Sequence, residues 1–280
     1  MISCFRRLVS SKTARYPEDQ LVEDYGRRLE TLHTAFRHEF GEPLGLAPVD
    51  GVLTVVVLSS RQSFDRYFQA RDRRQMAPAI KGIYEYDRRR VVIYHDFNVP
   101  YEVLFHEGAH QLVHYYALHE TDGRRALGST YWFQEGLGTY FEGFRRAADG
   151  RVTIEVGSNA GRLATLKQTL AQRGMKDFIP LTVLVGMSVD EFWEWYERGM
   201  AREPEETVRK AQLYYAESWA FIHFLRRQDG DLRAVFQDYF RAELGGRGHK
   251  DLFERMLRER TGYELSDLNQ SFVDFILALR

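Results

Sequence analysis

The sequence lacks several features that define whole classes of protein. Its 280 residues include one cysteine, Cys4, so no disulfide can form within the chain. Its longest apolar run, Val52–Leu58, is about one strand long and too short to span a bilayer. The net charge of −1 provides no overall field that would attract nucleic acid or an anionic membrane. The opening residues MISCFRRLVSS lack the apolar stretch of a signal peptide, so we expect a cytoplasmic protein as the chain stands, or an exported one if a leader has been trimmed.

The residues that are present are typical of a folded globular protein. Apolar residues make up 44% and charged residues 28%, which excludes a disordered tail, a collagen-like fibre and a coiled coil. The length suits one large domain or two modest ones. Only six of the 39 basic residues are lysine, and arginines gather in the runs Arg71–Arg74 and Arg88–Arg90. Solvated turns are the simplest interpretation of these runs, and a rim that attracts acidic ligands is the alternative.

The apolar spacing predicts that the first part of the chain mixes helices with strands. The expected elements are a helix at 17–40, a strand at 51–58, a helix at 63–73 and a hairpin of strands at 81–86 and 90–95. Pro17 suits the first position of the first helix, and Gly41 is expected to end it. The continuous β-branched run of the first strand indicates that this strand is buried.

The rest of the chain is mostly helical from about Thr130 onward. Ser188 and Glu191 have the spacing of a capping box, which predicts that a helix begins there. Further helices are expected at 208–227, 232–244, 250–258 and 265–279. Strands that come early and helices that come late favour an α+β fold with a small mixed sheet. We expect an N-terminal α/β part with an edge hairpin at 1–97 and a helical part that carries the functional site at 98–280, together forming one continuous unit.

The clearest chemical motif lies in a helix that Asn98 and Pro100 are expected to open. It reads His106-Glu107-Gly108-Ala109-His110, an H-E-x-x-H pattern. Residues four apart on a helix lie about 40° apart around its axis and about 6 Å apart along it, so both imidazoles can face one metal ion. Glu107 lies about 100° further round, where it can reach a water at that metal. A chance match on an ordinary helix is the alternative.

A catalytic zinc site needs a third protein ligand and one open position. A longer protease pattern would place glycine at 113 and histidine at 116, but Val113 and Tyr116 stand there. His114 and His119 are better interpreted as surface or supporting residues. Glu135 is the preferred third ligand.

An aromatic-rich stretch at 131–142, YWFQEGLGTYFE, predicts the helix that supplies this ligand. Gly136 and Gly138 each cost about 1 kcal/mol inside a helix, a cost that is explained if the backbone must approach another element closely. Glu142 lies two turns beyond Glu135 and can accept the spare N–H of a ligand histidine. A solvated carboxylate is the alternative for both glutamates.

The segments HEGAHQL and WFQEGLGTYFE together resemble the gluzincin zinc metallopeptidase superfamily, the thermolysin-like and aminopeptidase-N-like group. They are most similar to a bacterial gluzincin-like domain family of unknown function. The segment YAESWAFIHFL at 215–225 resembles the late helix of that family, so the resemblance covers roughly residues 100–225. A 24-residue gap before Glu135, Gln134 and Gly138 depart from the family pattern, but none of these departures removes a ligand.

The resemblance implies a thermolysin-like catalytic domain that holds one zinc ion per chain through His106, His110 and Glu135. It implies a metallopeptidase, with an endopeptidase favoured, that hydrolyses peptide bonds through a zinc-activated water with Glu107 as general base. Tyr215 is implied as the oxyanion donor by its spacing to Trp219. Tyr214 is the alternative donor, and core packing is the plain alternative for both tyrosines.

An edge strand beside the zinc helix would pair with the substrate backbone in such a fold, and the strands at 81–86 and 90–95 are the candidates. The expected partner is a peptide or protein substrate, with no nucleic acid and no membrane. A non-catalytic gluzincin-like zinc-binding or protein-interaction module is the main alternative. Nucleic-acid binding through the arginine runs is less favoured, because the net charge is −1 and no such motif is present.

Overall fold

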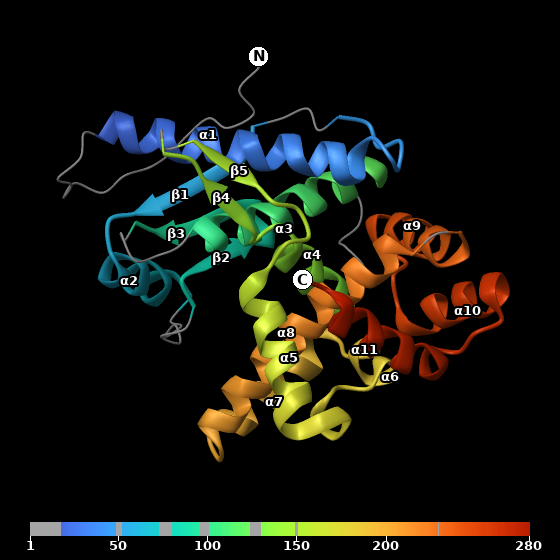
Figure 1. Cartoon of the computed structure of the whole chain (residues 1–280). Coiled ribbons are helices and arrows are strands. Elements are labelled where there is room, and N and C mark those ends of the chain that lie inside the picture. Colours follow the sequence, from blue (N-terminus) through green and yellow to red (C-terminus); the bar gives the residue numbers. More distant parts are fainter. Residues whose placement is uncertain are drawn as a thin grey trace. The chain divides into compact units, whose positions relative to one another are not determined.

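The computed structural model describes residues 18–48, 52–72, 80–95, 101–123, 130–148, 151–228 and 230–280. It confirms the expected α+β class, since helices predominate and two small sheets accompany them (Figure 1). The chain divides into two compact units. The first runs to Tyr116 and includes Phe141–Val156, and the second comprises Ala117–Tyr140 and Gly157–Arg280.

The first unit contains the strands and the helix that carries the H-E-x-x-H motif. Its elements are α1 (Glu18–Phe36), the π-helical turn η1 (Arg37–Gly41), β1 (Thr54–Leu58), α2 (Arg61–Asp72), β2 (Gly82–Glu85), the 3-10 turn η2 (Tyr86–Arg88), β3 (Arg90–Tyr94), most of α3 (Tyr101–Glu120), β4 (Phe144–Arg146) and β5 (Val152–Ile154). The predicted helices and strands of this region are confirmed. Pro17, Asn98 and Pro100 lie outside the described residues.

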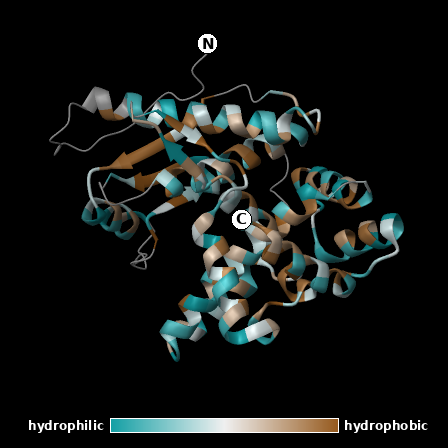
Figure 2. Ribbon diagram, viewed as in Figure 1, coloured by the Kyte–Doolittle hydropathy of each residue, from teal (hydrophilic) through white to brown (hydrophobic). Residues whose placement is uncertain are grey.

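The larger sheet is mixed, as predicted, with the strand order β1-β3-β2. β1 runs parallel to β3, with Thr54 opposite Arg90, and β2 runs antiparallel to β3, with Gly82 opposite Ile93. β2 is therefore an edge strand. Figure 2 shows β1 as a continuously hydrophobic strand, in keeping with the burial of Val55, Val56 and Val57.

Helix α3 packs in the same unit as the strands, so the observed division of the chain differs from the boundary expected at residue 97. Glycines permit this packing on two sides of the helix. A Cβ atom at Gly108 would lie 2.5 Å from the Leu32 side chain of α1, and a Cβ atom at Gly82 of β2 would lie 2.7 Å from Val103. The apolar stripe of α1 completes this core, where Phe36 stacks on Tyr116 with ring centroids 5.5 Å apart.

The second unit is helical in its described residues. Its elements are α4 (Tyr131–Tyr140), α5 (Ala160–Arg173), η3 (Gly174–Asp177), α6 (Leu181–Leu184), α7 (Val189–Met200), α8 (Pro204–Arg227), α9 (Asp231–Leu244), α10 (Lys250–Thr261), η4 (Leu265–Asp267) and α11 (Leu268–Ala278). The predicted capping box of Ser188 and Glu191 is present at the start of α7. The four later predicted helices are confirmed within a few residues at their ends. Trp132 of α4 is fully buried and stacks on Tyr239 of α9.

One hairpin of the first unit was not expected from the sequence. Strands β4 and β5 pair antiparallel, with Arg145 opposite Thr153, and belong to the first unit.

Among the described residues, no helix combines the length and the apolar composition needed to cross a bilayer.

Candidate metal centre

The buried apolar face of α3 fixes the orientation of the helix and hence of its two histidines. Leu104, Phe105, Ala109 and Leu112 are at most 1% exposed and anchor the helix in the core. His110 is 7% exposed and the side chain of His106 is 12% exposed. The four-residue spacing brings the two rings together, with centroids 4.7 Å apart.

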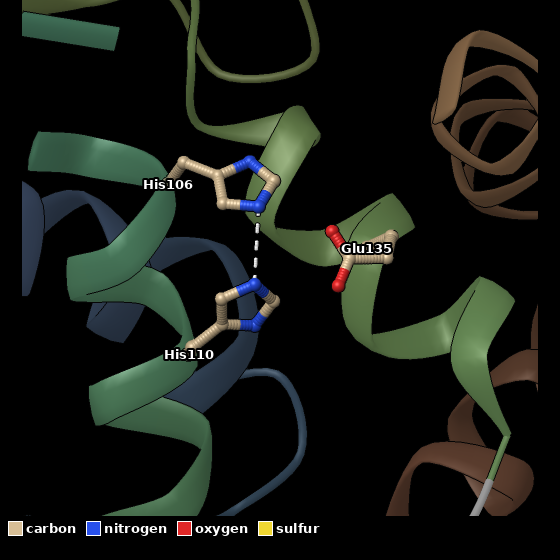
Figure 3. A group of neighbouring side chains, drawn as sticks. All are labelled: His106, His110 and Glu135. Atoms are coloured by element: carbon tan, nitrogen blue, oxygen red, sulfur yellow. Dashed lines mark hydrogen bonds between the residues drawn. The ribbon is translucent and has the colours of Figure 1, made fainter. Parts of the chain in front are cut away.

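The hydrogen bonding of His106 leaves its Nε2 atom directed toward His110. Its Nδ1 atom lies 2.9 Å from Oε1 of Glu142. Because a carboxylate only accepts hydrogen bonds, Nδ1 donates its proton, and Nε2 keeps a lone pair. Nε2 of His106 lies 3.1 Å from Nε2 of His110, as the dashed line in Figure 3 shows. Glu142 therefore lies where it can accept the spare N–H of His106.

Glu135 completes a group of three potential ligands. One ligand atom from each of His106, His110 and Glu135 lies within 4.8 Å of the other two, and the carboxylate faces the two rings in Figure 3. Glu135 is 8% exposed. Two imidazole nitrogens and one carboxylate oxygen are a donor set that suits zinc. The residues present are therefore compatible with a metal site.

The position of α4, which carries Glu135, depends on a close approach to α8. A Cβ atom at Gly136 would lie 2.7 Å from the backbone oxygen of Ser218 and 2.8 Å from the Ile222 side chain. This tight contact between two helix backbones explains why glycine stands at this position despite its cost in a helix, as the sequence suggested.

Glu107 faces the edge strand β2. Its Oε2 atom accepts a hydrogen bond of 2.8 Å from the backbone N–H of Tyr84. Backbone N–H groups of an antiparallel strand alternate between the partner strand and the opposite edge, so this N–H points away from β3. A Cβ atom at Gly82 would lie 3.2 Å from Cγ of Glu107, and only glycine lets β2 come so close. The outer edge of β2 and the carboxylate of Glu107 are therefore neighbours.

The same tyrosine makes a second bond to α3. The Tyr84 hydroxyl lies 2.8 Å from Nδ1 of His114. Burial, with the Arg89 charge, lowers the pKa of His114 to about 4, so this ring is neutral near pH 7 and accepts the hydroxyl proton. His114 is outside the group of three ligands and has a supporting position, while His119 is exposed.

The two candidate oxyanion donors have different surroundings. Tyr214 is 1% exposed, and its hydroxyl donates to the backbone oxygen of Leu184 at 3.1 Å. Tyr215 is partly buried, and its hydroxyl lies 2.8 Å from the hydroxyl of Tyr131. Sequence reasoning missed Tyr131, which stands four residues before Glu135 on the same face of α4. Burial, with the Glu135 charge, raises the pKa of Tyr131.

Two arginines of the run at 88–90 bind a buried carboxylate, Glu85, at the end of β2. Glu85 accepts bonds from Arg90 at 2.6 Å, Arg88 at 2.9 Å and the Tyr67 hydroxyl at 3.0 Å. Burial alone would raise the pKa of Glu85, but these bonds outweigh it and lower the pKa. Arg88 and Arg90 thus fix the end of the edge strand. Arg73 and Arg74 of the other run lie outside the described residues.

Comparison with known proteins assigns the chain to a family. Residues 102–242 match the family described as "Protein of unknown function (DUF1570)", and the chain belongs to this family. The matched span includes the H-E-x-x-H motif, Glu135 and Tyr215. No curated protein matches the sequence. The family description supplies no activity, so the function has to be argued from the site.

Proposed function

We propose that the protein is a zinc-dependent metallopeptidase of the gluzincin type. The observation that carries the proposal is that His106 and His110 of the H-E-x-x-H motif lie within ligand distance of Glu135 on α4. The same motif places Glu107 on the adjoining face of α3. The resemblance of the three sequence segments to gluzincins supports the same reading. We infer a thermolysin-like arrangement from these features together.

The three ligands would hold one zinc ion, and Glu142 would fix the ring of His106 through its Nδ1 proton. The metal, when bound, would polarise the substrate carbonyl as a Lewis acid and increase the acidity of water. Proton transfer, stabilisation of the oxyanion and binding of the substrate backbone would be performed by the surrounding side chains and backbone.

Glu107 would act as general base and then as general acid. As a water oxygen forms its bond to the peptide carbon, the carboxylate takes up the water proton. When the carbon–nitrogen bond breaks, the same group passes a proton to the leaving amine. The Tyr84 N–H holds Oε2 of Glu107 in the resting state and so fixes the direction of the carboxylate.

Tyr215 would donate a hydrogen bond to the oxyanion that develops on the carbonyl oxygen. When Tyr131 donates its hydroxyl proton to the Tyr215 oxygen, the Tyr215 proton can be directed to the substrate. Tyr214 is the weaker candidate, because its hydroxyl would have to give up its buried bond to Leu184.

The edge strand β2 would bind the substrate backbone. Of the two strands that the sequence offered, β3 is central and has neighbours on both sides, whereas β2 has an outer edge beside Glu107. An extended peptide added to that edge would place a peptide bond near the general base.

A cleavage assay with zinc-loaded protein tests this proposal. The wild type and Glu107→Gln are compared on a mixed peptide library, with Glu197→Gln as a matched control at an exposed position. We expect the wild type and the control to cut internal peptide bonds, and Glu107→Gln to lose at least about 100-fold in rate. Cleavage that survives in Glu107→Gln would contradict the assigned base. Zinc-loaded protein that cuts nothing would favour the alternative, a non-catalytic zinc-binding or protein-interaction module.

A further inference from the structure

A basic groove lies in the first unit, between α1 and the β4–β5 hairpin, which Figure 1 shows crossing beside the helix. Its volume is about 780 Å³, within the range of sites that hold ligands. The residues that define its chemistry are Asp24, Arg27, Arg28, Arg145, Arg151 and Thr153. We call it the arginine groove.

The lining of the groove carries a strong excess of positive charge. Four arginines stand against one aspartate among its described lining residues, and with Glu155, which pairs with Arg145, the net charge is +2. The chain as a whole has a net charge of −1, so this excess is a local feature. Such a concave basic surface concentrates anionic ligands.

The single aspartate is already engaged by one of the arginines. Asp24 accepts two bonds from Arg28, at 3.0 and 2.9 Å, and Arg28 is 6% exposed with its guanidinium 3.6 Å from the centre of the Tyr101 ring. This pair forms a fixed wall of the groove. Arg27, which is 74% exposed, reaches Asp24 only at 3.8 Å. The carboxylate of Asp24 therefore does little to offset the charge of Arg27.

The opposite wall offers a second exposed arginine. Arg145 is 74% exposed and pairs with Glu155, itself 40% exposed, at 3.2 Å. An ion pair between exposed side chains is worth little, so a ligand carboxylate can replace Glu155 at small cost. Guanidinium groups bind carboxylates and phosphates through two parallel hydrogen bonds, and the carboxylate with which Arg145 already pairs favours a carboxylate-bearing ligand.

The backbone of the hairpin favours an extended ligand. In a two-stranded ribbon each strand has one edge outside the pair, and the pairing of Arg145 with Thr153 sets which side chains flank those edges. An extended peptide can bind such an edge through its backbone while its side chains reach the arginines.

We propose that the arginine groove is an exosite that binds an acidic peptide segment of the substrate protein, an assignment that rests on the proposed peptidase function. The groove adjoins the metal centre through β4. Glu142, which holds His106, stands three residues before Arg145, a span of at most about 11 Å. Phe144, between them, packs on Phe105, the residue before His106. A substrate whose acidic segment lies a few residues from the cleaved bond would reach both sites.

Binding is measured with a fluorescein-labelled peptide of eight glutamates, by fluorescence anisotropy, on the full chain carrying Glu107→Gln so that no cleavage interferes. The groove variant is Arg27→Glu with Arg145→Glu. The matched control, Arg198→Glu with Arg241→Glu, makes the same charge change at exposed positions outside the groove. A peptide of eight glutamines and a single-stranded DNA of eight nucleotides serve as competing probes. Circular dichroism verifies that each variant is folded.

We expect the glutamate peptide to bind about tenfold more weakly to the groove variant, and the control to stay within about twofold of the parent. The glutamine peptide should not bind. Equal weakening in the groove variant and the control would overturn the proposal, and tighter binding of the DNA would overturn the peptide assignment.

A cleavage arm separates the two proposals. With Glu107 restored, a substrate that carries a glutamate segment should show a higher KM in the groove variant with kcat unchanged. Groove binding in a protein that cleaves nothing would overturn the peptidase function and the exosite role, while the groove would stand as a binding site for acidic peptides. Cleavage with identical KM in the groove variant would overturn the exosite alone.

Discussion

The buried carboxyl group of Glu243 makes the stability of the protein depend on pH. Glu243, on α9, has no exposed surface and accepts bonds from the hydroxyls of Tyr239, at 2.8 Å, and Thr130. Burial raises its pKa to about 7, although the two hydroxyl bonds act in the opposite direction. The ordinary value of 4.5 applies in the unfolded chain.

The sign and size of the effect follow from these two pKa values. Below about pH 4.5 the group is protonated in both states and costs nothing. Between about pH 4.5 and 7 the unfolded chain releases the proton while the folded chain retains it, so stability falls as the pH rises. Above pH 7 the loss is complete. A difference of two to three pKa units corresponds to about 3 kcal/mol.

The variant Glu243→Gln removes the titration and keeps the size of the side chain. Urea unfolding of both proteins at pH 5, 6, 7 and 8 measures the effect, followed by tryptophan fluorescence, to which the buried Trp132 beside Tyr239 contributes. We expect the free energy of unfolding of the variant to gain about 2.5 kcal/mol on that of the wild type between pH 5 and 8. The exposed change Glu197→Gln should give no gain. Parallel stability curves for wild type and Glu243→Gln would refute the reasoning.

Three further changes test contacts around the metal centre. Glu142→Ala should weaken zinc binding about 10–100-fold in a chelator competition. An unchanged affinity would show that Glu142 does not orient the His106 ring for metal binding. Gly82→Ala should cost about 1–3 kcal/mol in urea unfolding, since its Cβ would lie 2.7 Å from Val103; a neutral result would show that β2 can shift freely. Tyr84→Phe leaves buried His114 without its partner and should cost about 1–3 kcal/mol, whereas an unchanged midpoint would mean that water replaces the hydroxyl.

Local pattern was enough to predict that His106 and His110 share one helix face. The helical spacing of His106 and His110 fixes their common face, and the glycines at 136 and 138 of an aromatic-rich helix pointed to a close approach of Glu135. The common face of the two histidines is a property of a single helix, whereas the approach of Glu135 joins α3 to α4 and was expected only from these glycines and from the resemblance of both segments to gluzincins. Tyr131 was within reach of the same reasoning, because it stands one helical turn before Glu135.

Contacts between distant segments could not be predicted in this way. The bonds from Tyr84 to Glu107 and His114 span more than twenty residues and depend on how β2 packs against α3. The β4–β5 hairpin was missed because strands of three residues are too short to show an alternating pattern, and the arginine groove exists only because that hairpin lies beside α1. The boundary expected at residue 97 fell between elements that pack together, since sequence shows where helices begin and not which neighbours they bury.

The zinc content of the purified chain tests the central claim most directly. Elemental mass spectrometry, without added zinc, compares the wild type with Glu135→Ala and with Glu197→Ala as the exposed control. The account predicts about one zinc per chain in the wild type and the control, and most of it lost in Glu135→Ala. No zinc in the wild type, or equal zinc in Glu135→Ala, would contradict the three-ligand site.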